Sequence, residues 1–354
     1  MSTTTARHPS PTARAATARA ATARAVLATA LAAALAATAL VSTAGGAQAS
    51  PGDDPAYDPA HTAATAPDRS SGCGAPAPQQ PGASELRTIT SGGRERSYQL
   101  HLPDGYRADR AWPVILVFHG RGNTGAGTEA FAGLDSLPAV VAYGNGVVGT
   151  GSGDRQAWEG APYSAPGVDD VQYTRDLLDQ LEASLCVDTR RVYATGKSNG
   201  AGFTGILACD LSDRIAAIAP VAGAFYGTGH PTCSPTRPVP VIDFHGTGDV
   251  TIPYAGDSDR GLPAIPDWVA AWAARNGCNA GPLTTRTAPD VTTSRWVGCK
   301  RGAEVTHVAV LGGGHTWPGE DSYSGGGYAT HSIEASEVMW EFLRDERLPA
   351  TRSL

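Results

Sequence analysis

The stretch RVYATGKSNGAGF, residues 191–203, decides the fold. It begins with β-branched and aromatic residues, passes through a Gly-x-Ser-x-Gly turn and continues into an apolar segment. Small residues on both sides of Ser198 allow a strained residue to project from a strand-to-helix turn above a sheet. The stretch therefore predicts a strand, an elbow at Ser198 and a helix, although the pattern alone also fits a plain glycine-rich turn.

Similar apolar runs recur on both sides of this stretch. They predict further strands at 98–102, 113–119, 218–222, 239–245 and 305–311. The runs at 113–119 and 239–245 are apolar on both faces, which is typical of central strands in a covered parallel sheet. Amphipathic stretches predict helices at 169–185, 265–274 and 333–343, the first with Asp169 or Asp170 as its N-cap. Strands that alternate with helices predict one α/β domain over 73–354, with a mostly parallel central sheet and helices on both faces.

Composition excludes several classes of protein. The chain has 354 residues, of which 41% are hydrophobic and 17% charged, as in a globular protein. Its formal net charge is −7, and Lys197 and Lys300 are its only lysines. Binding to nucleic acid needs a basic face, so we expect no nucleic-acid partner.

The N-terminus has the pattern of a secretion signal. Four arginines precede an Ala/Leu-rich run at 25–41, and Ala-Gln-Ala follows at 47–49. A membrane anchor is the alternative, but alanine is weakly apolar and the cleavage pattern follows promptly. We expect residues 1–49 to be a signal peptide, 50–72 a flexible Pro/Ala-rich linker, and the mature chain to be secreted and not membrane-bound.

The six cysteines all follow the expected signal peptide. An even number in an exported chain favours three disulfides. Cys278 and Cys299 would close a loop of about 21 residues, whereas the other four cysteines allow three pairings. No Cys-x-x-Cys or His-x-x-x-His pair is present, and we expect neither a metal nor a cofactor.

A serine nucleophile needs a base and an orienting carboxylate, and in this architecture they follow in the order Ser, acid, His. Asp249 follows the predicted strand 239–245, and His315 follows 305–311 in a glycine-rich loop. We therefore predict Ser198, Asp249 and His315 as the catalytic residues. His307 lies within a predicted strand and is interpreted as a structural histidine.

An oxyanion site needs two N–H donors. One would be the backbone N–H of Asn199, which follows Ser198. The other would come from the loop 119–123, with Arg121 as the preferred donor and Gly120 as the alternative.

The blocks LVFHGRGNTG, LCVDTRRVYATGKSNGAGF, FHGTGDVTIPYAG, IPDWVAAWAARNGC and GGGHTWPG resemble secreted feruloyl esterases of carbohydrate esterase family one. They also resemble the related polyhydroxybutyrate-depolymerase-like esterases. The resemblance implies an α/β-hydrolase fold, the same three catalytic residues and a disulfide between Cys278 and Cys299. It further implies hydrolysis of feruloyl esters of plant cell-wall polysaccharide through an acyl-enzyme, by what we expect to be a monomer. The alternatives are 3-hydroxyalkanoate oligomers or acetylated xylan as substrates, and acyl transfer in place of hydrolysis.

Aromatic residues cluster in the loops near the predicted site. We predict that Trp158, Tyr254 and Trp317 contact the substrate. Their rings could form a flat apolar slot in which a planar cinnamoyl ring stacks. About half of the aromatic residues in these loops are expected to pack within the protein instead.

Overall fold

A computed structural model describes residues 68–350 except 152, 228–232 and 321. The expected signal peptide lies outside the described residues, as does the predicted linker up to residue 67. The final five linker residues, 68–72, do not form a free linker. Ser70 and Gly72 donate backbone hydrogen bonds to Val187 and Glu182, so the folded domain begins before Cys73.

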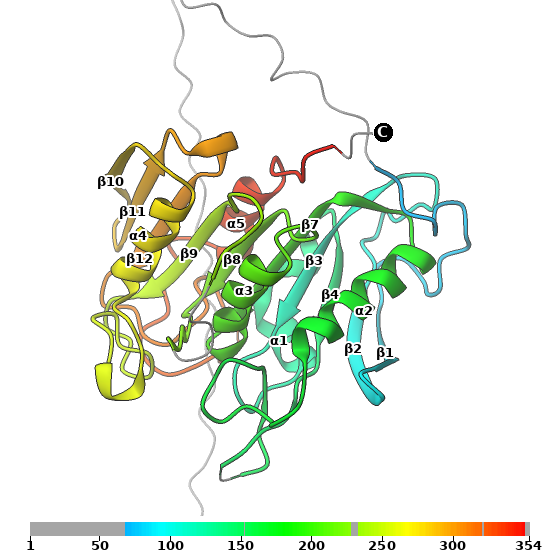
Figure 1. The fold of residues 1–354 in the computed structure, drawn as a ribbon, viewed down its shortest axis with the longest axis horizontal. Coiled ribbons are helices and arrows are strands. Elements are labelled where there is room, and N and C mark those ends of the chain that lie inside the picture. Colours follow the sequence, from blue (N-terminus) through cyan, green and yellow to red (C-terminus); the bar gives the residue numbers. More distant parts are fainter. Residues whose placement is uncertain (1–67, 152, 228–232, 321, 351–354) are drawn as a thin grey trace, which may run out of the picture. The chain divides into compact units, whose positions relative to one another are not determined.

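A ten-stranded sheet in the order β1-β2-β4-β3-β7-β8-β9-β12-β11-β10 forms the centre of the domain (Figure 1). The six strands from β4 to β12 in this order are parallel, and antiparallel strands extend both edges. The parallel strands are β4 (Val140–Gly144), β3 (Trp112–Phe118), β7 (Val187–Lys197), β8 (Ala217–Val221), β9 (Val241–Gly246) and β12 (Val305–Val310). The antiparallel strands are β1 (Ser84–Ser91) and β2 (Arg94–His101) on one side, and β11 (Val291–Val297) and β10 (Ala280–Ala288) on the other, with β1 and β10 at the edges. A separate two-stranded sheet joins β5 (Val147–Val148) to β6 (Gln156–Ala157).

Helices cover both faces of this sheet, as predicted. On one face α2 (Asp170–Ser184), α3 (Asn199–Asp210) and α4 (Ile265–Arg275) pack into a core that includes Leu177, Phe203 and Trp272. On the other face α1 (Gly125–Ala132) and α5 (Ala335–Leu343) pack into a second core. The two apolar clusters explain why the central strands are apolar on both faces. Among the described residues, no helix is long and apolar enough to cross a membrane.

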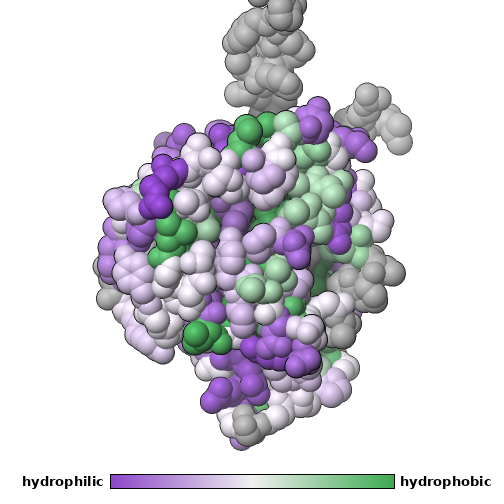
Figure 2. All heavy atoms as spheres, turned by 90° about the vertical axis from the view of Figure 1, so that its left-hand side faces the viewer, coloured by the Kyte–Doolittle hydropathy of each residue, from purple (hydrophilic) through white to green (hydrophobic). Residues whose placement is uncertain are grey.

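The structure contains elements that the sequence patterns did not predict. These are β1, β4, α1 and the hairpin of β10 and β11. The residues of β10 are exposed apart from the half-buried Ala288, so this strand lacks the apolar signal of a central strand. Figure 2 shows the corresponding face of the molecule, where polar and apolar residues are interspersed.

Three disulfides fasten loops to this framework. Cys278 is joined to Cys299, as the resemblance implied, and the bond closes the base of the β10–β11 hairpin. The other bonds are Cys73–Cys186 and Cys209–Cys233, which settles the pairing that was open at the sequence level. Cys73 thereby ties the start of the domain to the residue before β7.

Candidate active site

Ser198 occupies a strained elbow between β7 and α3. Its backbone has φ 56° and ψ −117°, a left-handed conformation that is costly for a residue with a side chain. The surrounding hydrogen bonds hold it there, because the Ser198 N–H donates to Val221 and its carbonyl accepts from Gly202 and Ala224. The predicted strand–elbow–helix arrangement is therefore present.

Glycines flank the elbow because backbone approaches it closely. A Cβ on Gly200 would lie 2.1 Å from the carbonyl oxygen of Phe118, and a Cβ on Gly196 would lie 2.5 Å from the same atom. Both contacts are far shorter than van der Waals contact, so only glycine fits. The loop that follows β3 can consequently lie directly against the elbow.

Asp249 and His315 are brought to the same edge of the sheet. They follow β9 and β12, which are neighbouring parallel strands, so both loops emerge at the carboxyl ends. His315 Nδ1 donates to Asp249 Oδ2 over 2.7 Å. His315 and Ser198 line one pocket. Among the hydrogen bonds of the described residues, none joins Ser198 Oγ to His315, a contact that often tightens only when substrate binds.

Asp249 is held as a carboxylate. Burial opposes its charge, but hydrogen bonds from His245 and His315 and from the Ile252 N–H keep its pKa well below the usual range. His245 Nε2 lies 3.4 Å from Asp249 Oδ2 and also approaches the carbonyl oxygen of Ile252, at 2.9 Å. The Thr251 N–H adds a further hydrogen bond to the carboxylate. The Asp249 charge can thus orient His315 and stabilise its protonated form.

The charge of Lys197 acts on the pKa of His315. Burial lowers the pKa of His315, and the nearby Lys197 ammonium lowers it further, against the opposing effect of Asp249. Burial also lowers the pKa of Lys197 to about 8, although Asp249 and Glu320 favour its charged form. Lys197 is a residue of the site that was not predicted from the sequence, although its position directly before Ser198 was an available signal.

The loop after β3 lies against the nucleophile, as the oxyanion prediction requires. A Cβ placed on Gly120 would lie 3.4 Å from Ser198 Cβ. His119 supports this loop, since its Nε2 accepts from the Gly146 N–H and its carbonyl accepts from the Trp158 indole. Burial lowers the pKa of His119 to about 4, so the ring is neutral at pH 7 and able to accept. Among the hydrogen bonds of the described residues, none is donated by the backbone N–H of Gly120, Arg121 or Asn199, so each of these groups can serve as a donor and the choice between Gly120 and Arg121 stays open.

The structure corrects the three predicted substrate contacts. Trp158 is fully buried and stacks on Phe203 in the core, so its ring supports the fold. Trp317 is 1% exposed and packs against Phe131 beneath α1. Tyr254 donates its hydroxyl to His307 and does not line the pocket. Position in the loops expected around the site did not reveal where these rings point, because the direction of each ring is set by tertiary packing.

His307 has the structural role expected of it. Its Nδ1 bonds to Asp243 over 2.8 Å and its Nε2 to Tyr254, so both ring nitrogens are satisfied. No nitrogen is left to act on a substrate.

The pocket around Ser198 has a volume of about 300 Å³. Its aromatic members are Tyr163 and Tyr226, which lie edge to face with ring centres 5.9 Å apart. Arg121 lies over the Tyr163 ring at 4.3 Å. The lining comprises Gly120, Arg121, Asn123, Arg155, Tyr163, Lys197, Ser198, Tyr226, Thr251, Ile252, Arg260, His315 and Ser324.

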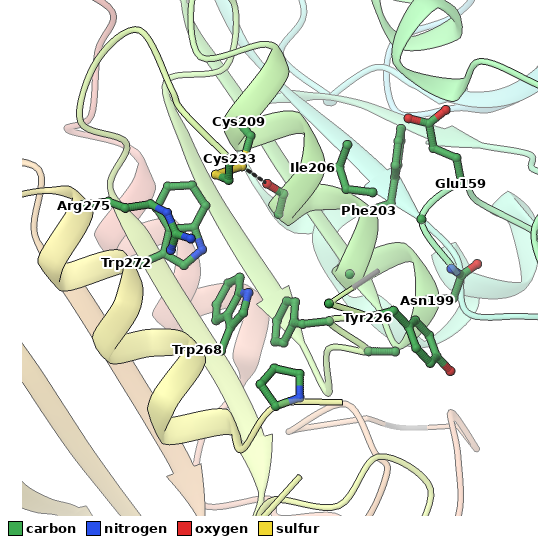
Figure 3. A pocket seen from close by; sticks show the side chains of 17 residues that line it. Glu159, Asn199, Phe203, Ile206, Cys209, Tyr226, Cys233, Trp268, Trp272 and Arg275 are labelled. Atoms are coloured by element: carbon green, nitrogen blue, oxygen red, sulfur yellow. Dashed lines mark hydrogen bonds between the residues drawn. A yellow bond between two sulfur atoms is a disulfide. The ribbon is translucent and has the colours of Figure 1, made fainter. Parts of the chain in front are cut away.

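A second, mainly apolar cavity of about 170 Å³ adjoins it along α3. Figure 3 shows Trp268 and Trp272 of α4 on one side of this cavity and Phe203 and Ile206 of α3 on the other. The Trp268 ring stacks on Phe225 with centres 3.6 Å apart. Tyr226 lines both cavities, so the apolar cavity begins beside the nucleophile pocket.

One group of possible metal ligands exists among the described residues, formed by His101, Glu129 and Asp135. Its members already have protein partners, since Tyr143 donates to Asp135 over 2.7 Å and Ser84 contacts His101 at 2.9 Å. This internal satisfaction gives no indication of a bound ion. None of the three residues lines the Ser198 pocket.

Comparison with known proteins agrees with this fold. The fold resembles an acetyl xylan esterase from Aspergillus awamori, with a TM-score of 0.53, 15% identity, and coverage of 74% of this chain and 99% of that one. The sequence is 31% identical to NocK of Nocardia uniformis subsp. tsuyamanensis, a protein named as an esterase, over 66% of this chain and 74% of that protein. It is also 31% identical to feruloyl esterase B of Piromyces equi over 62% of this chain, but spans only 42% of that protein. No protein-family model matches the chain.

The fold and the Ser-His-Asp arrangement are those of the α/β-hydrolase class, and the similarity to NocK places the chain among its esterases. Within this class, the chain belongs to the family of esterases that includes NocK and the feruloyl esterases.

Proposed function

We propose that this protein hydrolyses hydroxycinnamoyl (feruloyl-type) esters of plant cell-wall saccharides through an acyl-enzyme on Ser198. The strained Ser198 elbow, in one pocket with the Asp249-oriented His315, is the observation that carries this proposal. Membership of the family that includes the feruloyl esterases supports the choice of acyl group.

The arrangement suits a two-step reaction. Ser198 Oγ attacks the ester carbonyl carbon while His315 Nε2 takes the hydroxyl proton, and the N–H groups of Asn199 and Arg121 would stabilise the oxyanion. His315 then gives the proton to the departing alcohol oxygen. Water, deprotonated by His315, attacks the acyl-enzyme and releases the acid and free Ser198. Asp249 remains a carboxylate and holds the imidazole tautomer.

Removal of the nucleophile tests the site. Ser198→Ala should lower kcat on methyl ferulate by at least about 10³-fold while the fold persists, as loss of a triad member does. An organophosphonate should label the wild type at Ser198 and fail to label the variant, as peptide mapping by mass spectrometry would show. Labelling at another serine, or an active alanine variant, would contradict the assignment.

The aromatic acyl group fits the apolar cavity. A cavity of roughly 150 Å³ is large enough to hold a benzene ring, and this one is about 170 Å³. Trp268, Phe225 and Tyr226 offer ring faces and edges within it. Aromatic pairs add ~0.5–1.5 kcal/mol beyond burial, and an acetyl or hydroxybutyryl group cannot gain this.

A substrate panel tests the acyl preference. Methyl ferulate should exceed acetylated xylan and soluble hydroxybutyrate oligomers in kcat/KM. Trp268→Ala should reduce kcat/KM for methyl ferulate about 2- to 10-fold more than for an acetyl ester, following the same stacking energy. The control is Trp340→Ala, a half-buried tryptophan on α5, beyond the opposite face of the sheet. Faster cleavage of acetyl or hydroxybutyryl esters would instead favour those substrates.

We also propose that the protein acts outside the cell. All six cysteines are paired, which requires an oxidising compartment in most organisms. Together with the N-terminal signal pattern, the pairing supports export. Recovery of the cleaved chain from the culture medium, with its new N-terminus sequenced, tests this proposal.

A further inference from the structure

Positive charge is concentrated in the pocket that holds Ser198. Four of its 13 lining residues are basic, namely Arg121, Arg155, Lys197 and Arg260, and none of the 13 is an aspartate or glutamate. The whole chain has the opposite balance, with 27 Lys+Arg against 34 Asp+Glu. The pocket is therefore a local positive region in a negatively charged protein.

Much of this charge lacks an acidic partner. Within the described part of the chain, Arg121, Arg155 and Lys197 form no salt bridge, although Arg121 lies over the Tyr163 ring. Arg260 lies 3.8 Å from Asp257 and donates to the Thr251 carbonyl.

Lys197 is the most deeply buried of these basic side chains. It is 4% exposed, and no hydrogen bond to its ammonium is recorded in the described part of the chain. Asp249 and Glu320 act on it at a distance, without direct contact. A buried cation is costly unless a partner compensates it, so the pocket is suited to a ligand that brings negative charge.

The two adjoining cavities can hold the two parts of an ester, the acyl group in one and the alcohol part in the other. The apolar cavity offers aromatic rings for the acyl group, and Tyr226 marks the point where it meets the nucleophile pocket. An ester with its carbonyl at Ser198 and its ring in the apolar cavity would place the alcohol part in the nucleophile pocket. The arginines therefore face the alcohol part.

We propose that the alcohol part of the substrate carries a carboxylate, as a saccharide containing a uronic acid does. This inference rests on the proposed esterase function and adds the charge of its leaving group. The planar guanidinium groups of Arg121, Arg155 and Arg260 can donate paired hydrogen bonds to a carboxylate, and Lys197 adds a point charge. The local field also attracts an anion that the net charge of −7 would otherwise repel.

The test compares two feruloyl esters that differ in one group. One is a feruloylated uronic acid methyl glycoside, and the other is the same compound with the carboxyl group reduced to a primary alcohol. The acidic ester should have a kcat/KM at least about tenfold higher at low ionic strength. The ratio should fall as salt rises from 10 mM to 500 mM, because exposed charges are screened within about 10 Å at 0.1 M.

Variants assign the effect to the pocket. Arg155→Gln and Arg260→Gln should each lower the acidic-to-neutral ratio about two- to fivefold, a size typical of exposed charge pairs. Arg94→Gln, at an exposed position of β2, removes the same charge away from the pocket and should leave the ratio unchanged. Equal rates for the two esters, or a ratio that neither pocket variant changes, would overturn the proposal.

A second pair of substrates tests whether the pocket prefers a carboxylate on the acyl part or on the alcohol part of the ester. Methyl 4-carboxycinnamate and methyl cinnamate place or omit the carboxylate on the acyl group. A stronger preference for charge on the acyl side would refute the assignment to the alcohol. If both feruloyl esters resist hydrolysis, the proposed esterase function itself fails, whereas hydrolysis of the neutral ester alone leaves it intact and overturns only this inference.

Discussion

At the residue scale, the site depends on charges placed around one imidazole. His315 receives opposite influences from Asp249, which favours its protonated form, and from burial and Lys197, which disfavour it. A base that must be neutral to accept the serine proton benefits from the lowered pKa. Lys197 should therefore affect catalysis as well as binding, because its ammonium lowers the pKa of His315.

Substitution of Lys197 tests this electrostatic coupling. In Lys197→Met, loss of the positive charge should raise the pKa of His315, so the acid limb of kcat/KM should move to higher pH. A pH profile from 4 to 9 measures the shift. Lys300→Met is the matched control, because Lys300 is the only other lysine and does not line the pocket. An acid limb at the same pH in wild type and Lys197→Met would show that the coupling is negligible.

At the element scale, close backbone packing positions the nucleophile. The strand β3 and the helix α3 approach each other at the elbow so closely that Gly196 and Gly200 admit no side chain. The same approach brings the loop with Gly120 and Arg121 to Ser198. The geometry of the oxyanion site therefore depends on an interface between two elements.

A methyl group at the elbow should separate these elements. Gly200→Ala places a Cβ 2.1 Å from the Phe118 carbonyl oxygen and 2.5 Å from that of His119, so β3 or α3 must shift. Activity on methyl ferulate should fall by more than about 10²-fold and the free energy of unfolding by about 1–3 kcal/mol, as in overpacked cores. The control is Gly105→Ala, where the nearest atom would be 3.7 Å away. Kinetics and urea unfolding measure the two effects, and a fully active Gly200→Ala would contradict this account.

The Cys278–Cys299 bond should affect stability more than activity. It closes a loop of 21 residues at the base of the β10–β11 hairpin, and neither cysteine lines the nucleophile pocket. Replacement of both by serine should lower the free energy of unfolding by ~2–4 kcal/mol, mainly through the unfolded chain. Denaturant unfolding and kcat/KM at 15 °C measure the outcome. A large loss of activity with unchanged stability would place the bond in the active site's support.

At the scale of the whole molecule, a half-buried carboxyl group makes stability depend on pH. Burial, together with the charges of Glu304 and Asp345, raises the pKa of Glu346 to about 7 against the effect of Arg237. Between about 4.5 and 7, the folded state therefore holds more protons at this group than the unfolded state does. Its contribution destabilises the fold progressively as pH rises through this window, and the full cost is present above it.

Glu346→Gln should remove this cost. At pH 8 the variant should be more stable than the wild type by about 1–3 kcal/mol, and at pH 4.5 the two should be nearly equal. Urea unfolding at both pH values measures the difference. Glu341→Gln, at an exposed position of α5, serves as the control. An equal difference at pH 4.5 and pH 8 would show that ionisation of Glu346 is not the cause.

The sequence by itself determined the class of fold and the position of the nucleophile. Apolar runs of strand length are local signals, and they predicted the parallel strands β3, β7, β8, β9 and β12. The Ser198 elbow could also be predicted from the sequence, because its conformation depends on adjacent glycines. Since parallel strands place their following loops at one edge, the order of the strands sufficed to bring Asp249 and His315 toward Ser198.

Tertiary structure alone decided which side chains face the substrate. Trp158 and Trp317 lie in loops that were expected to surround the site, yet their rings enter the two cores, whereas Trp268 reaches the apolar cavity from α4. The pairing of four cysteines and the exposed β10–β11 hairpin likewise had no local signal. The physical reason is that a ring's direction, a disulfide and a cluster of basic side chains each depend on neighbours distant in the chain, which periodicity and spacing do not report.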